Sequence, residues 1–387
     1  MTSEKVRESG NPLKTPAILK RIPHSLKIVL LIIVITKILV FSLGFAVTYM
    51  NEGAAPPLQI LMHQFSRRWD SPHYLDIAEH GYVNEGEQQL FIVFLPLYPF
   101  LIRLFTFNLE YINLSAIVVS NVGSVAAAIY LFKLAKLDFG DSVAKKAVIY
   151  LCVFPTAYFV SAVYTEGLFF GLVISSVYYA RTGKWATAGF LSFFAALTRL
   201  AGLLLLPTLL VEYLHQKEWK PRKIDFNVLW VGLAVMGFLI YLSINNTVTG
   251  NYFTFMEIER THWSQTLDPL QGLRGAWSWS FMAAFPASLT VGVAQLSFAV
   301  FGLLMVIGGF LRRFRPSYNV YMLLTWMLAV STGWRISVPL YVMAMFPMFI
   351  LLGLLARKKI VHYTIVAVFT AVLCVFTVLF ALGIWAF

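Results

Sequence analysis

Apolar runs long enough to cross a bilayer recur along this chain from Leu26 onward, most of them about 20 residues long. Only 12% of the 387 residues are charged, and the mean hydropathy is +0.74. Soluble domains usually contain roughly a quarter of charged residues. The sequence therefore predicts an all-α polytopic membrane protein, a bundle of about eleven transmembrane helices with no soluble domain.

The net charge of +12 comes from basic residues that form short clusters between apolar runs rather than one stripe. This pattern is typical of membrane orientation signals and does not indicate nucleic-acid binding. The clusters are Lys5 to Lys27, Lys133 to Lys146, Arg181 with Lys184, Lys217 to Lys223, Arg312 to Arg315, and Arg357 to Lys359. We expect a cytoplasmic tail at 1–27, one transmembrane domain at 28–387, and outer loops at 51–113 and 249–280.

The expected spans are Leu26 to Met50, 114–135, 143–163, 165–180, 185–198, 200–215, 227–246, 283–310, 318–332, 336–355 and 360–385. Lys37 lies near the middle of the first span, so either it is buried against a partner or the true span starts later; we favour a later start. Phe94–Phe105 is expected to be an interfacial or re-entrant helix with Arg103 on its polar side, because a full span there would reverse the orientation of Lys133 to Lys146.

The stretch Arg67 to Tyr82, RRWDSPHYLDIAEHGY, is unusually polar for this chain. Ser71 followed by Pro72 indicates a helix start, and His80 followed by Gly81 indicates its end, which predicts a short helix from Pro72 to about His80. Asp70 would precede the positive end of that helix, where a carboxylate is held in its charged form. Asp70 is then either a base or a simple helix cap beside two arginines.

Seven charged residues are expected on the outer side and can line one cavity: Asp70, Asp76, Glu79, Arg103, Glu166, Arg199 and Arg335. Guanidinium groups bind phosphate in bidentate fashion, and a carboxylate can remove a proton from an attacking hydroxyl. Sugar transfer from a lipid phosphate fits these groups, and it needs no paired acid because the leaving phosphate is a weak base. Glu166 and Arg199 would alternatively pair only with each other at a helix junction.

At these residues the sequence resembles a known family. The Arg67–Tyr82 motif, the following LPLYPFLIR, then FPTAYFVSAVYTEGLFF, TGNYFTF with Trp263 and Pro269, and STGWRISVPLYVMAMFPMF are similar to the PIG-V-like mannosyltransferases of the GT-C superfamily. The resemblance covers residues 60–355 in consistent order. Where the eukaryotic pattern has Arg-x-Asn-Gly, this chain reads Arg199, Leu200, Ala201, Gly202; this departure and the compact length argue against a GPI acceptor but not against the chemistry.

The resemblance implies a GT-C fold, a polyprenyl- or dolichyl-phosphate-mannose donor, inversion at the anomeric carbon, and a catalytic carboxylate in the first outer loop. That role maps onto Asp70. We expect a glycolipid or glycan acceptor, and contacts to membrane lipids. The residues expected to bind substrate are Arg68, Trp69, His73, Tyr74, Asp76, Glu79, Arg103, Tyr164, Glu166, Arg199, Trp263 and Arg335.

No cofactor and no metal are expected, because Asp70 and Asp76 are six residues apart and project from different faces of a short helix. Cys152 and Cys374 both lie in apolar runs and form no zinc or disulfide pattern. The expected location is a plasma membrane in a prokaryote or the endoplasmic reticulum membrane in a eukaryote, with the site on the extracytoplasmic side.

Two alternatives remain open. A sister GT-C enzyme that uses another lipid-phosphate sugar would carry the same groups. A transporter of a lipid-linked or anionic solute would also use intramembrane charges, but it should show an internal repeat and charges at the midplane. No repeat is apparent, and the charges gather at the outer edge.

Overall fold

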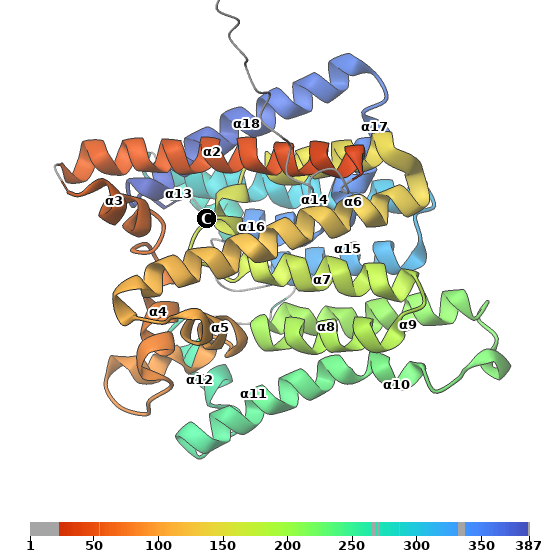
Figure 1. Cartoon of the computed structure of the whole chain (residues 1–387), viewed down its shortest axis with the longest axis horizontal. Helices are drawn as coiled ribbons and strands as arrows, with labels where there is room; N and C mark the ends of the chain where they lie inside the picture. Colours follow the sequence, from red (N-terminus) through yellow and green to blue (C-terminus); the bar gives the residue numbers. More distant parts are fainter. Residues whose placement is uncertain are drawn as a thin grey trace, which may run out of the picture.

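The computed structural model describes residues 23–53, 55–264, 268, 271–285, 287–331 and 337–385, and every regular element in these ranges is a helix. Most helices run along the long axis of the molecule (Figure 1). The helices are α2 (His24–Glu52), α3 (Pro57–His63), α4 (Ser71–His80), η1 (Glu87–Val93), α5 (Leu97–Phe105), η2 (Leu109–Tyr111), α6 (Ile112–Cys152), η3 (Ala157–Val160), α7 (Glu166–Arg181), α8 (Trp185–Thr198), η4 (Leu200–Leu204), α9 (Leu205–Gln216), η5 (Pro221–Lys223), α10 (Val228–Val231), α11 (Leu233–Thr249), α12 (Thr254–Thr261), α13 (Gln271–Met282), η6 (Ser288–Val293), α14 (Ala294–Leu311), α15 (Pro316–Ser331), α16 (Val338–Ala344), α17 (Pro347–Leu355) and α18 (Lys359–Ala381).

The all-helical membrane fold is confirmed, whereas the count of about eleven spans is not. Within the described ranges, five helices are long and apolar enough to cross a bilayer, or up to seven if two bent helix pairs each count as one span. Several predicted spans are short helices instead. α8 has 14 residues, which is about 21 Å and less than the roughly 30 Å hydrocarbon core.

The long helix α6 consists of two helical segments that are separated by a turn. α6 turns at Gly140, whose φ of 78° lies in the left-handed region that glycine adopts without steric cost. This turn separates the predicted spans 114–135 and 143–163. The second of these was predicted too long, because α6 ends at Cys152 and Pro155 cannot continue it.

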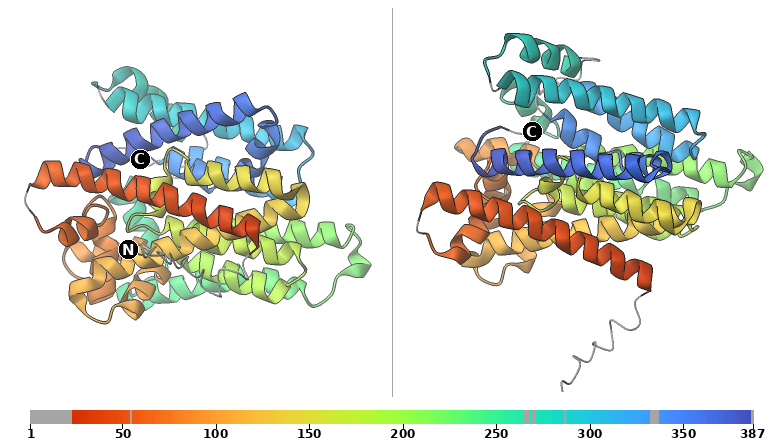
Figure 2. Two further views of the ribbon diagram at one scale, coloured as in Figure 1. Left: turned by 45° about the horizontal axis from the view of Figure 1, so that its top comes forward. Right: turned by 90° about the horizontal axis from the view of Figure 1, so that it is seen from above.

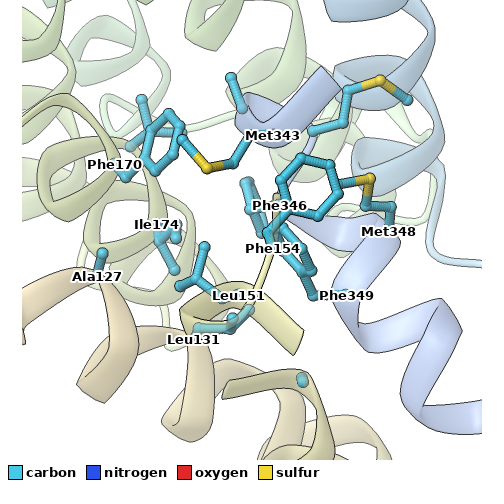
Figure 3. Close-up of a cluster of buried hydrophobic side chains, with 14 of the residues drawn as sticks. Ala127, Leu131, Leu151, Phe154, Phe170, Ile174, Met343, Phe346, Met348 and Phe349 are labelled. Carbon is cyan, nitrogen blue, oxygen red and sulfur yellow. The ribbon is translucent and has the colours of Figure 1, made fainter. Parts of the chain in front are cut away.

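The residues between α6 and α7 form a buried irregular segment, 153–165, that contains η3. Phe154 opens this segment and packs edge-on against Phe349 of α17, with ring centroids 5.5 Å apart. Figure 3 shows Phe154 among apolar side chains from α6, α7, α16 and α17. This core fixes the segment and hence the residues before α7, which belong to the candidate site.

Lys37 is buried within α2, so the favoured later start of the first span is wrong. α2 begins at His24, and residues 1–22 of the expected tail lie outside the described residues. The Lys37 ammonium donates hydrogen bonds to the Val160 carbonyl at 2.9 Å and to Ser161 Oγ at 2.8 Å. The irregular segment thus supplies acceptors that satisfy a lysine at membrane depth.

The first outer loop folds into short helices, as expected. α5 follows η1 after a bend of 110°, which is the geometry of a re-entrant or broken segment. Arg103 lies on the exposed side of α5. α4, α5 and α12 gather at one end of the molecule (Figure 1).

The opposite end collects the turns that carry the basic clusters, as the positive-inside pattern requires (Figure 1). Arg181 binds Asp138 through Nη2 at 2.5 Å, and Arg315 binds Glu212 at 2.6 Å. These pairs join α6 to α7 and α9 to the start of α15. α18 starts at the same end and packs along α2 (Figure 2).

Cysteine labelling tests which end faces outward. In a background with Cys152→Ser and Cys374→Ser, we expect Glu85→Cys to react with an impermeant maleimide in intact cells, because Glu85 is exposed in the first outer loop. Arg222→Cys, exposed at the basic end, should react only after permeabilisation. Labelling of Arg222→Cys but not Glu85→Cys in intact cells would invert the topology.

Candidate active site

The loop-to-helix junction at the start of α4 positions Asp70. α4 begins at Ser71, one residue earlier than predicted, and ends at His80 as predicted, before Gly81 with a φ of 78°. Asp70 occupies the cap position, but its side chain makes no capping hydrogen bond. The capping alternative for Asp70 is therefore wrong, and its carboxylate is available for another role.

Tyr164, from the irregular segment before α7, holds the backbone on both sides of this junction. Its hydroxyl accepts a hydrogen bond from the Asp70 backbone N–H at 3.2 Å and donates one to the Arg68 carbonyl at 3.3 Å. A single phenol therefore fixes the direction in which the Asp70 side chain leaves the turn. Tyr164 was expected to bind substrate, and its hydroxyl is used here in positioning.

The residues just before Asp70 are anchored on the far end of α18. Trp69 has a φ of 54°, a left-handed conformation that is costly for a bulky residue. Its indole packs edge-on against Trp385, with ring centroids 4.0 Å apart. Arg68 Nη2 donates a hydrogen bond to the Ala381 carbonyl at 3.0 Å. These contacts account for the strained turn, so Arg68 and Trp69 support Asp70 rather than lining open space.

Asp70 lies in an environment that opposes its ionisation. Burial raises the pKa of Asp70 to about 6, the negative charge of Glu166 adds to the rise, and Arg199 opposes it. We expected the helix N-terminus to favour the charged form of this carboxylate, but burial and a neighbouring carboxylate raise its pKa despite the dipole. A pKa of about 6 makes Asp70 a stronger base than an ordinary aspartate and still mostly ionised at neutral pH.

Glu166 and Arg199 form a buried ion pair next to Asp70. Arg199 Nη1 donates to Glu166 Oε1 and also to Thr165 Oγ1 at 2.9 Å. The Glu166 side chain is 2% exposed, whereas that of Arg199 is 22% exposed. The pair lines a small cavity, and Tyr341 lies across it with its ring 5.8 Å from the Arg199 guanidinium. Glu166 and Arg199 therefore pair, as in the alternative that they meet at a helix junction. Arg199 nevertheless also lines the cavity.

Aromatic rings form one wall beside Asp70. His73, one turn into α4, lies with its ring centroid 4.3 Å from Phe91 of η1 and 6.2 Å from Trp263, which follows α12. Burial lowers the pKa of His73, which favours the neutral imidazole. Tyr74 packs edge-on against Phe94, with ring centroids 5.1 Å apart. His73, Tyr74 and Trp263 thus lie around the junction, as their assignment to substrate binding requires.

Other predicted site residues lie elsewhere. Asp76 pairs with His80 at 3.2 Å, and Glu79 is exposed on the same outer side of α4. Arg103 is exposed on α5. Arg335 lies outside the described residues. Of the seven outer charges, the structure brings Asp70, Glu166 and Arg199 together and leaves Asp76, Glu79 and Arg103 at the surface.

Glu259 of α12 is a site residue that the sequence analysis missed. Burial raises the pKa of Glu259 to about 7, and the negative charge of Asp70 adds to the rise. Phe255, Glu259 and Trp263 are spaced four residues apart and share one face of this short segment. This spacing, which places an acidic residue between two inward-facing aromatic residues, is the sequence signal that could have identified Glu259.

The family model for "Mannosyltransferase (PIG-V)" matches residues 19–263. The match includes the first outer loop, the Glu166–Arg199 pair and α12. The chain belongs to the PIG-V mannosyltransferase family. Its several long apolar helices are typical of a membrane protein.

The fold of this PIG-V family protein is similar to that of a solved GT-C enzyme, ArnT from Cupriavidus metallidurans, whose crystal structure contains undecaprenyl phosphate. The TM-score is 0.52 at 15% sequence identity, and the similarity covers 87% of this chain and 62% of ArnT. This chain therefore spans less than two thirds of the ArnT length. A comparison with curated proteins finds no match.

The carboxylates of this PIG-V family protein are not arranged as a metal site in the part of the chain that the structure describes. No three His, Cys, Asp or Glu side chains gather there in ligating geometry. Asp76 turns to His80 on the outer face of α4, away from the junction that holds Asp70. Metal independence stays a prediction.

We expect sugar transfer to persist when the purified enzyme is treated with excess EDTA, because Asp70 has a guanidinium neighbour and no second ligand from Asp76. The measurement compares initial rates with and without chelator and after adding Mg²⁺ or Mn²⁺. Loss of activity on chelation that either ion restores would show that a metal takes part.

Proposed function

We propose that this protein transfers mannose from a polyprenyl- or dolichyl-phosphate-mannose donor to an acceptor hydroxyl at the extracytoplasmic membrane face, with inversion at the anomeric carbon. Membership of the PIG-V family supports mannose as the sugar. The undecaprenyl phosphate bound to ArnT, which has a similar fold, supports a lipid phosphate as the carrier. The acceptor is a glycolipid or a glycan.

Asp70 is the general base in this proposal, and the observation that carries it is the free, half-buried carboxylate at the start of α4. It makes no capping bond, its backbone is fixed by Tyr164, and its pKa is raised to about 6. A base is most effective when its pKa lies near the operating pH. Asp70 accepts the acceptor proton as the acceptor oxygen forms its bond to the anomeric carbon.

The bond from the anomeric carbon to the phosphate oxygen breaks in the same displacement, and the lipid phosphate leaves with the electron pair. Arg199 stabilises the negative charge on that phosphate, since this cation lines the cavity and its charge also acts on Asp70. Glu166 holds the guanidinium in place from the buried side. A general acid is unnecessary, because a phosphate leaving group does not need a proton.

Attack by the acceptor on the face opposite the phosphate inverts the anomeric centre in a single displacement. No covalent sugar–enzyme intermediate is required, unlike in retaining enzymes, where a second carboxylate acts as a nucleophile. Glu166 is bound to Arg199 and Thr165, so it is not free to serve as such a nucleophile.

The test is transfer by the purified protein in vesicles that contain mannosyl, glucosyl or arabinosyl lipid phosphate. We expect turnover with the mannosyl donor to exceed that with the other two, and NMR of the product should show an inverted anomeric configuration. A preference for the glucosyl or arabinosyl donor would identify a sister GT-C activity. Uptake of an intact lipid-linked sugar without cleavage would identify a transporter.

A further inference from the structure

Lys37 is a cation at membrane depth for which the proposed reaction gives no role. It lies near the middle of α2, and its amino group donates to the Val160 carbonyl at 2.9 Å and to Ser161 Oγ at 2.8 Å. Among the residues that the structure describes, Lys37 forms no ion pair, so both of its acceptors are neutral. A lysine at this depth is costly, and an ionisable residue inside a membrane usually marks a functional position.

The segment that begins at these acceptors, residues 160–164, is attached to the turn that holds Asp70. The Val163 N–H donates to the Phe65 carbonyl at 3.1 Å. The Asp70 N–H donates to the Tyr164 hydroxyl at 3.2 Å. The segment therefore holds the chain at two points that are five residues apart, and the proposed base is at the second. A shift of the segment would move Asp70 with it.

One face of α2 contacts both of these parts of the chain. Phe41, one turn after Lys37, packs edge-on against Phe65, with ring centroids 5.5 Å apart. Gly44 approaches Phe65 so closely that a Cβ atom there would lie 2.7 Å from the phenyl ring. Lys37 contacts the other part through the Val160 carbonyl. Positions three and four residues apart share a helix face, so α2 aligns the segment with the turn.

We propose that Lys37 is a positioning residue for sugar transfer, because it fixes segment 160–164 along α2 and thereby the place of Asp70. Packed rings can slide past each other, whereas the two hydrogen bonds of Lys37 are directional and fix the register of the segment. A base must lie within hydrogen-bond reach of the proton that it removes, and a shift of about 1 Å can cost about a hundredfold in rate. This inference rests on the proposed function.

The test measures release of undecaprenyl phosphate from mannosyl undecaprenyl phosphate in vesicles, with octyl α-mannopyranoside or water as acceptor. Lys37→Met keeps most of the side-chain length and removes the donors, so it should lower kcat about ten- to a hundredfold with the donor KM unchanged. The donor KM is spared because none of the described residues that line the Arg199 cavity belongs to α2.

Two further variants make the comparison specific. Ser161→Ala keeps the lysine and removes one of its acceptors, so it should lower kcat in the same direction. Thr36→Val is the matched control, because the Thr36 hydroxyl bonds only to the Ile32 and Ile33 carbonyls of its own helix in the described part of the chain. It should keep the wild-type kcat. Thermal unfolding in detergent shows whether each variant is folded.

A double-mutant cycle with Tyr164→Phe gives the decisive readout. Tyr164→Phe removes the hydroxyl that holds the turn, so adding Lys37→Met should lower kcat by less than about a further twofold, because the same linkage is already broken. A structural effect that does not pass through Tyr164 would instead multiply the two losses. The rise of turnover through about pH 6 should persist in Lys37→Met, because Asp70 is still present.

Wild-type kcat in a folded Lys37→Met protein would overturn the inference, as would multiplied losses in the double variant or an equal loss in Thr36→Val. If Lys37→Met does not fold, wild-type kcat in Ser161→Ala would overturn it. Failure of the proposed function is different, because the wild type would then release no undecaprenyl phosphate from the mannosyl donor with either acceptor.

Discussion

Asp70→Asn is expected to lower mannosyl turnover about a hundred- to ten-thousandfold while donor affinity stays close to wild type. The amide has the shape of the carboxylate and keeps the backbone hydrogen bond to Tyr164, so the turn should remain intact. The measurement is single-turnover transfer by purified enzyme beside donor binding. Asp76→Asn and Glu79→Gln serve as controls, because both side chains lie on the outer surface of α4.

The pH dependence gives a second check on the same residue. A base must be unprotonated, and burial together with Glu166 raises the pKa of Asp70 to about 6, so wild-type turnover should rise as pH increases through that value. The residual activity of Asp70→Asn should lack this step. If Asp70→Asn kept more than about a tenth of wild-type turnover while Asp76→Asn or Glu79→Gln abolished it, the base would have to be reassigned.

Arg199→Met is expected to destabilise the protein by about 3 to 5 kcal/mol, because it leaves the buried Glu166 carboxylate without its partner. The double variant Arg199→Met with Glu166→Gln should recover most of that stability, since a neutral pair needs no charge compensation. It should nevertheless remain inactive, because the cavity has lost its cation. Thermal unfolding in detergent and transfer assays on the same samples separate the two effects.

Arg199→Lys distinguishes phosphate binding from simple charge balance. Lysine keeps the charge near Glu166 but cannot form the planar fork that holds both a carboxylate and a phosphate, so donor affinity should fall by roughly tenfold or more. Wild-type donor kinetics in Arg199→Lys would mean that another cation binds the phosphate.

Helix start and stop signals explain which parts of this site could be predicted from the sequence. The Ser71-Pro72 start and His80-Gly81 end determine α4 almost to the residue, because caps and breakers act within one helical turn. The electrostatics of Asp70 depend instead on Glu166 and Arg199, which are about a hundred residues away in sequence and arrive through tertiary packing. A helix-end rule therefore predicted the place of Asp70 correctly but did not predict the rise in its pKa.

Tertiary packing also explains two other differences between the sequence-based expectations and the structure. Lys37 looked out of place in an apolar run because its acceptors, Val160 and Ser161, lie in a segment whose irregular shape depends on the core around Phe154. Glu259 lay in a loop whose aromatic residues resemble ordinary membrane anchors, and its burial depends on the docking of α12 on η1. The sequence pattern shows only the neighbours of Lys37 and Glu259 along the chain. Their environments depend on residues that are distant in sequence and that the fold brings into contact with them.

The anchoring of the catalytic turn on α18 has a consequence for the biosynthesis of the enzyme. Arg68 and its acceptor, the Ala381 carbonyl, are 313 residues apart. At about 5 to 20 residues per second, the ribosome needs roughly 15 to 60 s after it has added Arg68 to reach Ala381. Throughout that interval the nascent chain already exposes α4 to the membrane surface, but the strained conformation of Trp69 has no support. If Asp70 is the base, we expect partly synthesised chains that lack α18 to be unable to transfer sugar.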